Sequence, residues 1–396
     1  MATANQISDL PVPSERRDAG LLVLLAAMPQ EQLGSVLANL TASFPADGLT
    51  IATPDTLAAD SWPHLRIIPI SATSSSWTLS AADFMNAYRL AEENEAGAIL
   101  MLGPGAESLR ASALCDLANG VLHAHTDLVL PCYHLSPHAG LINSAILYPL
   151  TRALFSSRAR FPLAIDLGLS LQMAERLAAA AQRFTKPDQG EAILWPINEA
   201  AVTGLTASEV DAGPRATPQP AELDINAILA SVTGSLFADI DAKAAFWQRV
   251  RYLPPPRDPS PPMPSVDASA DIAPMLDAFR LAYTNLQEIW SLVLPPNTLL
   301  GLKRLSVTDG AAFRMHDSLW ARIVFDFLLA YRLRTINRGH LLGALIPLYL
   351  AWVASHFNIT ASGINPERHI EAVSAAFEAD KPYLVSRWRW PDRFNP

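Results

Sequence analysis

The sequence is poor in cysteine, in charged residues and in long apolar runs, and each shortage excludes a class of protein. It has only two cysteines, Cys115 and Cys132, which exclude a disulfide framework and suit a reducing compartment. The longest apolar run, residues 341–354, contains Pro347 and is shorter than the roughly 20 residues that span a bilayer. We therefore expect no transmembrane segment. The run predicts a buried helix, with a helix at a membrane surface as the alternative.

The chain also lacks a basic stripe and a secretory signal. Its formal net charge of −9 argues against a partner that is a nucleic acid. The first residues are polar, without a charged region followed by a long apolar core, so we expect a cytoplasmic protein. Residues 1–18 are predicted to be disordered or extended.

What the sequence does contain is a globular composition, with 50% hydrophobic and 17% charged residues. A length of 396 residues accommodates one large domain and one smaller domain. The segment 253–264 is dense in proline and predicts a semi-rigid connector. We place an α/β domain at residues 19–252, a proline-rich linker at 253–271 and a helical domain at 272–396. In the helical domain, helices are predicted at residues 272–294, 296–305, 318–334, 341–357 and 366–388.

Apolar runs alternate with amphipathic segments in the first half of the chain. Four runs predict strands, at residues 20–27, 49–52, 65–70 and 97–102, and segments 30–40 and 81–95 have helical periodicity. This alternation is typical of a mostly parallel, nucleotide-binding sheet, which binds ligands at the carboxyl ends of its strands. The turn Gly103-Pro104-Gly105 follows the last run. It either presents backbone N–H groups to a phosphate or is a plain tight turn.

Residues 127–170 combine a strand, a polar loop and an amphipathic helix. The strand is predicted at 127–131, and the helix at 143–155 with Asn143 as its N-cap and a kink or late start at Pro149. The loop carries Tyr133, His134 and His138. Several side chains in this loop and just before the strand could bind zinc, or could be loop residues near a ligand pocket or surface histidines, and their spacing fits no standard zinc site. They are His123, His125, Cys132, His134 and His138.

Several segments together carry a family resemblance: Asn143, residues 148–154, Arg160, residues 166–170, 232–237, 319–327, 346–350 and 377–388. They resemble the retaining glycosyltransferases of the glucosylglycerate and mannosylglycerate synthase type. The resemblance implies a GT-A-like nucleotide-sugar-binding sheet of α/β class followed by a mostly α-helical C-terminal domain. It also implies a nucleoside diphosphate sugar as donor and a small hydroxy acid as acceptor.

The residues that bind the metal ion in this family are replaced here. Where the family has Asp-x-Asp at a strand end, this chain has Leu102, Gly103 and Pro104, and Arg215 falls near the position of the metal-binding histidine. The resemblance therefore implies that the usual Mg²⁺ or Mn²⁺ site is lost and that no cofactor is bound. An arginine could neutralise a diphosphate instead, either Arg215 or one of the two at positions 158 and 160, although all three could be surface residues.

The literal Asp-x-Asp of the chain, Asp239-Ile240-Asp241, lies in a segment with helical periodicity. A helix points residues i and i+2 to different sides, so this pair is interpreted as a solvated helix face.

The resemblance also assigns candidate site residues. On the catalytic side, Asp166 would orient the sugar hydroxyls, and Asn198 stands where the family carries a carboxylate. The residues implied for donor binding are Gly103, Gly105, Glu107 and Arg215. The residues implied for acceptor binding are Asn143, Tyr148, Thr151, Arg152 and Arg160.

Two functions remain open. One is hexose transfer from a nucleoside diphosphate sugar to a glycerate-like hydroxy acid, without a metal. The other is a catalytically inactive glycosyltransferase-fold protein that acts as a binding or partner subunit. The chain could also form a homo-oligomer. An active, metal-free enzyme should place an arginine or lysine at the strand end near Gly103, whereas an inactive one would fill that place with apolar side chains.

Overall fold

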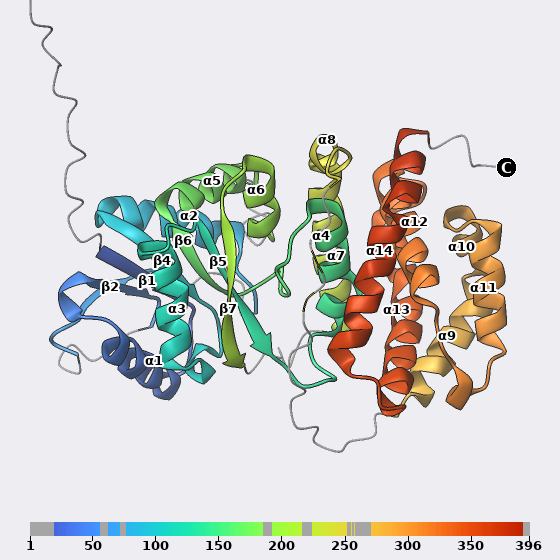
Figure 1. Ribbon diagram of the computed structural model, residues 1–396, viewed down its shortest axis with the longest axis horizontal. Coiled ribbons are helices and arrows are strands. Elements are labelled where there is room, and N and C mark those ends of the chain that lie inside the picture. Colours follow the sequence, from blue (N-terminus) through green and yellow to red (C-terminus); the bar gives the residue numbers. More distant parts are fainter. Residues whose placement is uncertain are drawn as a thin grey trace, which may run out of the picture.

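The computed structural model describes residues 20–55, 62–71, 77–184, 192–215, 224–251, 255, 257 and 271–390. The predicted N-terminal segment 1–18 and most of the predicted linker 253–271 lie outside these residues. Figure 1 shows a sheet-containing part built from the first half of the chain and a helical part that ends with the C-terminal helices.

Within the described residues, seven strands form one sheet in the order β3-β2-β1-β4-β6-β5-β7. Strand β6 is antiparallel to both neighbours and the other pairs are parallel. The predicted α/β fold class is confirmed. The strands are β1 Gly20–Leu25, β2 Leu49–Thr53, β3 Arg66–Pro69, β4 Ala96–Leu102, β5 Leu128–His134, β6 Asp166–Ser170 and β7 Ala207–Pro214.

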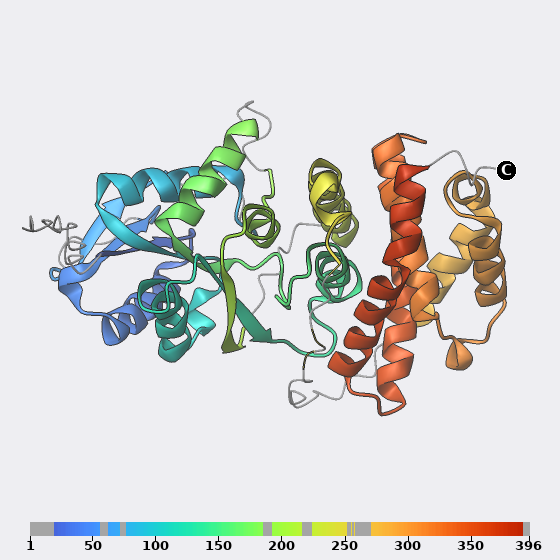
Figure 2. The same ribbon diagram turned by 45° about the horizontal axis from the view of Figure 1, so that its top comes forward.

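Helices cover both faces of the sheet, which is why its central strands are continuous apolar runs. Helix α2 (Ala81–Glu93) packs with α5 (Leu171–Ala181) on one face, and α1 (Gln30–Ser43) packs with α3 (Ala111–Leu122) on the other (Figures 1 and 2). Helix α3 approaches β6 so closely that a Cβ atom at Gly168 would lie 2.4 Å from the Leu117 carbonyl oxygen.

The C-terminal part is a set of packed helices. They are α9 Ala273–Asn285, α10 Gln287–Val293, α11 Pro296–Ser306, α12 Asp317–Leu333, α13 Arg338–Ala361 and α14 Pro366–Arg389. The predicted helical character is confirmed. The prediction of one helix over residues 272–294 is wrong, because the backbone leaves helical geometry at Leu286 (φ −108°, ψ 10°).

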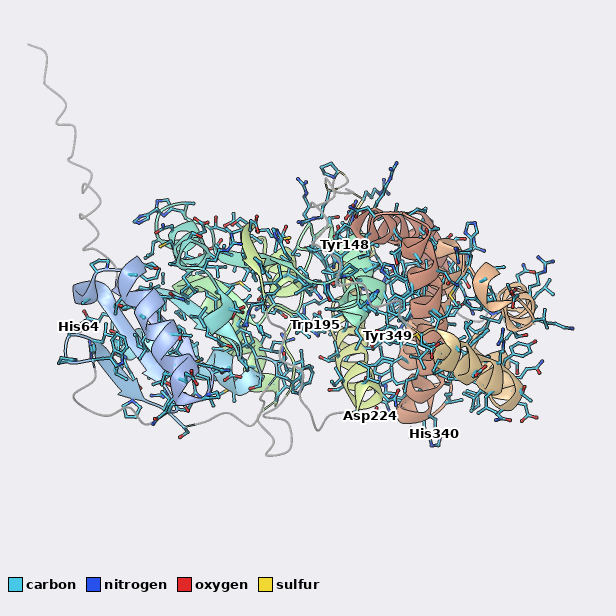
Figure 3. The ribbon with its side chains drawn as sticks, turned by 90° about the horizontal axis from the view of Figure 1, so that it is seen from below. His64, Tyr148, Trp195, Asp224, His340 and Tyr349 are labelled. Atoms are coloured by element: carbon cyan, nitrogen blue, oxygen red, sulfur yellow. The ribbon has the colours of Figure 1, made fainter. Side chains whose placement is uncertain are left out.

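A second hydrophobic core joins the C-terminal helices to helices from earlier in the chain. These are α4 (Tyr148–Phe155), α7 (Ile225–Ala242) and α8 (Ala244–Trp247), which lie between the sheet and α14 in Figures 1 and 2. Trp195, beside α6 (Pro196–Thr203), donates its Nε1 hydrogen to Ser235 Oγ on α7 at 3.1 Å (Figure 3). The domain boundaries stay a prediction, but this core draws on both sides of residue 253.

Helix α13 contains the apolar run that was predicted to be a buried helix. Leu341, Leu345, Leu348 and Ala351 are fully buried in the second core. Among the described helices, α7 and α13 are long and apolar enough to cross a membrane, by length and composition only. Helix α13 has 61% of its most apolar window buried inside the protein, which supports the buried-helix interpretation.

The start of α4 differs from the prediction. Asn143 is not an N-cap, because it lies inside a π-helical turn, Asn143–Leu147, that continues into α4. Pro149 has no N–H to donate to the carbonyl of Ala145, four residues earlier. That carbonyl instead accepts a hydrogen bond from Trp320 Nε1 on α12 at 2.8 Å. The irregular turn thus gains a partner from the helical part.

Candidate functional site

The centre of the candidate site is a fully buried ion pair at the carboxyl end of β4. Arg215 donates two hydrogen bonds to the Asp166 carboxylate, from Nε to Oδ2 at 2.9 Å and from Nη2 to Oδ1 at 3.1 Å. Tyr133 Oη donates to Oδ2 at 2.7 Å, and the Gly103 amide donates to Oδ1 at 3.0 Å. Both ionic side chains are 0% exposed. Within the described part of the chain, Asp166 therefore accepts four hydrogen bonds.

The predicted donor residues Gly103, Glu107 and Arg215 are brought together around this pair. Arg215 Nη2 donates to the Pro104 carbonyl at 2.9 Å, and Nη1 lies 3.4 Å from Ser108 Oγ. One Glu107 carboxylate oxygen is buried without a hydrogen-bond partner among the described residues, and its charge contributes to the raised pKa of Arg215.

Two glycines shape this turn. A Cβ atom at Gly103 would lie 2.8 Å from Ile165 Cβ, so the strand end has no room for a side chain there. Gly105 has a φ of 83°, in the left-handed region that favours glycine. The turn is therefore fixed by packing and backbone geometry, and the two glycines could not be exchanged freely for aspartate.

The residues at this strand end do not fit a divalent cation. A hard cation needs several oxygen ligands, and both oxygens of the Asp166 carboxylate are already occupied by Arg215, Tyr133 and the Gly103 amide. Glu107 adds a carboxylate oxygen without a partner among the described residues, and one such oxygen is too few. The Arg215 guanidinium would also repel a cation. No group of three or more His, Cys, Asp and Glu side chains that could hold a metal ion occurs among the described residues.

Asn198 lies in a separate polar cluster, and none of its hydrogen bonds reaches Asp166. Its Nδ2 donates to Asp239 Oδ2 at 2.9 Å, and Lys243 contacts Asp239 and, at 2.8 Å, Glu199 Oε1. The interpretation of Asp239 as a solvated residue is wrong, since its side chain is 15% exposed. Burial raises the pKa of Asp239, with the positive charge of Lys243 opposing this effect.

The predicted acceptor residues Tyr148 and Arg152 face helix α14. Arg152 donates from Nε to Glu378 Oε1 at 2.7 Å and from Nη1 to Glu371 Oε2 at 2.6 Å. Tyr148 Oη donates to Glu371 Oε1 at 2.6 Å. Thr151 is fully buried, and its Oγ1 has no hydrogen-bond partner among the described residues. The polar groups of Tyr148 and Arg152 are thus engaged by the carboxylates of α14.

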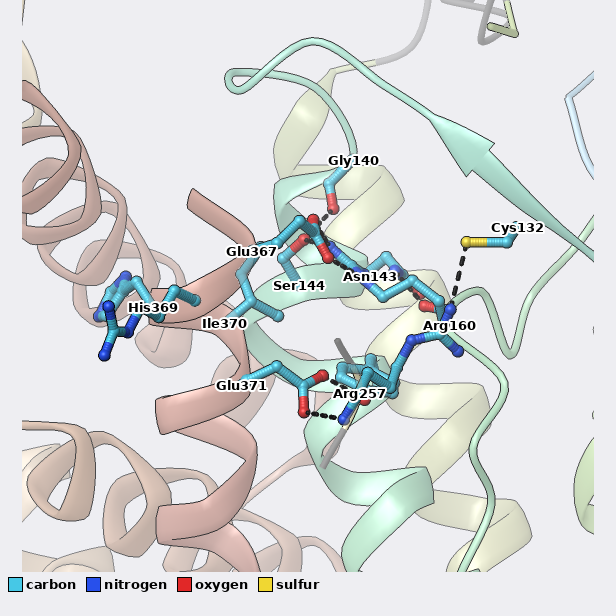
Figure 4. A network of polar contacts seen from close by, with 12 residues as sticks. Cys132, Gly140, Asn143, Ser144, Arg160, Arg257, Glu367, His369, Ile370 and Glu371 are labelled. Atoms are coloured by element: carbon cyan, nitrogen blue, oxygen red, sulfur yellow. Dashed lines mark hydrogen bonds and ion pairs between the residues drawn. The ribbon is translucent and has the colours of Figure 1, made fainter. Parts of the chain in front are cut away.

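Arg160, also predicted for the acceptor, lies in the loop between α4 and β6. Its guanidinium forms two hydrogen bonds of 2.9 Å to Glu367 in the first turn of α14, and another of 2.9 Å to Ser144 Oγ. Its carbonyl accepts a hydrogen bond from Asn143 Nδ2 at 2.9 Å (Figure 4). The structure thus brings Asn143 and Arg160 together, while their role in binding stays a prediction.

The glutamates of α14 are site residues that the sequence analysis missed. Glu367, Glu371 and Glu378 are spaced by four and seven residues, which places them on one face of a helix. That spacing was visible within the predicted helix 366–388. Its partners were not, because Arg160 and Arg152 lie 207 and 226 residues from the glutamates they contact.

The histidines and Cys132 do not converge. His134 Nε2 lies 3.0 Å from Asp211 Oδ1, and the His138 ring packs 4.5 Å from the Phe357 ring. Burial raises the pKa of Cys132 to about 11, and Arg257 Nη2 lies 3.3 Å from its sulfur. Tyr133 and His134, predicted to lie in a loop, belong to β5.

Three comparisons with known proteins were made, and one of them, with solved structures, gave matches. No protein-family model and no curated protein matches the chain. Solved structures of glucosyl-3-phosphoglycerate synthase from Mycobacterium tuberculosis do match. The complex with phosphoglyceric acid is 13% identical, with 56% of this chain and 80% of that chain covered and a TM-score of 0.36. The complex with Mn²⁺, UDP-glucose and phosphoglyceric acid is 14% identical, with 56% and 79% covered and a TM-score of 0.37.

Proposed function

We propose that this chain is a glycosyltransferase-fold protein that binds a nucleoside diphosphate sugar without a metal ion and transfers its hexose to a small hydroxy acid. The observation that carries the proposal is the Arg215 guanidinium beside Gly103 and Pro104, at the carboxyl end of β4. A diphosphate leaving group needs positive charge at this place, and a guanidinium supplies it in a geometry that suits phosphate oxygens. An arginine therefore lies at the strand end, as an active, metal-free enzyme would require.

In this reading, Asp166 holds the guanidinium in place. Among the hydrogen bonds of Arg215 to described residues, the contact of Nη1 with Ser108 Oγ is the longest, at 3.4 Å. A phosphate oxygen would replace the Ser108 hydroxyl as the partner of Nη1, while the two hydrogen bonds to Asp166 keep the guanidinium oriented. Asp166 would therefore act as a positioning residue. The free thiols Cys115 and Cys132 suit the reducing cytoplasm as the location.

The second candidate is a catalytically inactive protein of the same fold that serves as a binding or partner subunit. It is favoured by the ion pair itself, because Asp166 already neutralises the charge of Arg215 and neither side chain is exposed. A guanidinium whose charge is already balanced attracts a diphosphate less strongly than a free one. Under this hypothesis the pair is structural, and a nucleotide sugar does not bind.

Calorimetric titration with UDP-glucose and with GDP-mannose, each in Mn²⁺ and in EDTA, distinguishes the active transferase from the inactive protein. Binding that survives EDTA, weakens in Arg215→Lys and is unchanged in Arg89→Lys is the expected result. Arg89 also pairs with a carboxylate, that of Glu93 at 2.7 Å, but its side chain is 55% exposed, so it serves as the matched control. Binding only with Mn²⁺ would overturn the metal-free site. No binding in either buffer would reject transfer and favour the partner subunit.

A further inference from the structure

Arg160 and Glu367 form a two-point contact in which the two side chains are very unequally buried. The Arg160 side chain is 5% exposed, whereas that of Glu367 is 32% exposed. Arg160 comes from the loop before β6, and Glu367 from the first turn of α14 (Figure 4). The arginine is therefore the buried member of the pair, and the carboxylate is the member that has access to water.

A pocket of about 60 Å³ adjoins this contact. His134, Ser136, Ser144, Arg160 and Glu367 are among the residues that line it. Since one water molecule needs roughly 10–15 Å³ of such volume, the pocket holds several waters or the head group of a small acid. Arg160 Nη1 is buried and has no hydrogen-bond partner among the described residues, so the guanidinium keeps unused donor capacity.

We propose that Arg160 is the binding site of a small monocarboxylate and that Glu367 occupies it as an internal substitute until that ligand arrives. The inference deepens the proposed function, because this carboxylate would belong to the acceptor. A planar guanidinium binds a carboxylate through two parallel hydrogen bonds, and Glu367 already shows that geometry at 2.9 Å for both bonds. The ligand would displace Glu367 toward solvent.

The charges around the contact favour a monoanion. Arg160 lowers the pKa of Glu367 against the opposing effect of burial, so the substitute is ionised at neutral pH. Exchange of one monoanion for another leaves the local charge unchanged. A phosphate dianion would add negative charge near Glu209 and Glu371, which already pair with Arg257 and Arg152. The site should therefore select a carboxylate over inorganic phosphate.

Titration of the full chain with D-glycerate, in the absence of any donor, tests the inference. Removal of the internal competitor in Glu367→Gln should tighten glycerate binding by about tenfold or more, because apparent affinity scales with the fraction of the site that is open. Asp380→Asn is the matched control. Asp380 also lies on α14 and makes two hydrogen bonds to an arginine, Arg322, whose side chain is 48% exposed. This control should bind glycerate as the unmodified protein does.

Glycerol and inorganic phosphate are the comparison ligands, and both should bind Glu367→Gln more weakly than glycerate does. Arg160→Met in the Glu367→Gln background should lose glycerate binding while circular dichroism still shows a folded protein. Equal affinity of the unmodified protein and Glu367→Gln, no binding by folded Glu367→Gln, or stronger binding of phosphate would each overturn the inference. Donor titration is independent, so loss of donor binding with glycerate binding retained would overturn the proposed transfer alone.

Discussion

Two arginine–carboxylate pairs of this protein share their local geometry and differ in their surroundings. Asp166–Arg215 and Glu367–Arg160 are both held by two hydrogen bonds with nearly equal lengths. The first pair joins β6 to the end of β7, with both side chains 0% exposed. The second joins α14 to a loop, with the carboxylate 32% exposed. The difference teaches that two pairs with the same contact geometry can differ widely in how far they are removed from water.

Desolvation explains the difference. Ions that are removed from water are stable only when their remaining hydrogen-bonding capacity is satisfied, and Asp166 meets that condition through Tyr133 and the Gly103 amide. The Glu367 carboxylate, which is 32% exposed, regains water when it leaves, and a competing carboxylate then supplies the negative charge that the buried Arg160 needs. The first pair should therefore resist substitution and exchange, and the second should yield to a competing anion.

The largest expected effect comes from breaking the buried pair at one side. Arg215→Met should lower the free energy of unfolding by about 3–5 kcal/mol, because it leaves the Asp166 carboxylate buried without its charge partner. Urea denaturation measures this change. The double variant Asp166→Leu with Arg215→Met should recover most of the loss, since no unpaired charge then remains. A loss below about 1 kcal/mol in the single variant would show that the pair behaves as a surface pair.

A smaller effect is expected where the arginine is buried and its carboxylates are partly exposed. The Arg152 side chain is 3% exposed, and its partners Glu371 and Glu378 are 14% and 10% exposed. Arg152→Met should therefore cost about 2–3 kcal/mol in urea denaturation. The exposed Arg322 provides the control, and Arg322→Met should cost less than about 1 kcal/mol. Equal costs for the two variants would remove burial as the deciding factor.

A third carboxylate sharpens the comparison through pH. Asp326 is 0% exposed and pairs with Arg387, but its Oδ2 has no hydrogen-bond partner among the described residues, and burial raises its pKa to about 7. The unfolded chain releases this proton near pH 4, so the folded state binds more protons between about pH 4 and 7. Rising pH should therefore lower this residue's contribution to the free energy of unfolding.

The expected slope is at most about 1.4 kcal/mol per pH unit in that window. Urea denaturation at several pH values measures it, with Asp326→Asn as the comparison. The difference in stability between the two proteins should change with pH. A difference that stays constant from pH 5 to 8 would contradict a raised pKa of Asp326.

The smallest expected effect is that of metal removal. Because a guanidinium and not a divalent cation neutralises Asp166, thermal unfolding in EDTA and in Mn²⁺ should differ by less than about 1 °C in Tm. Differential scanning fluorimetry checks this. A clear rise of Tm with Mn²⁺ that is absent in Asp166→Asn would mean that Asp166 exchanges Arg215 for a cation. Both ion pairs would then be able to exchange a partner.

Much of the fold could be predicted from local patterns. Three predicted apolar runs are strands that end at Leu25, Thr53 and Leu102. They could be recognised because a strand that is buried on both faces of its sheet needs apolar side chains throughout. The helices of the C-terminal half follow the 3.6-residue period. Strands β6 and β7 were not predicted, because β6 contains Gly168 and β7 is largely polar, so neither shows a clear apolar run.

The sequence by itself determined strands β1 to β5, the helical character of the C-terminal half and, through the resemblance, the set that contains Asp166, Arg160 and Arg215. Only the tertiary structure decided how those charges are paired. Arg215 meets Asp166 across 49 residues and Arg160 meets Glu367 across 207, which no local period records. The physical reason is that secondary structure depends on neighbours along the chain, whereas the fate of a charge depends on its distance from water and from charges that only folding brings close.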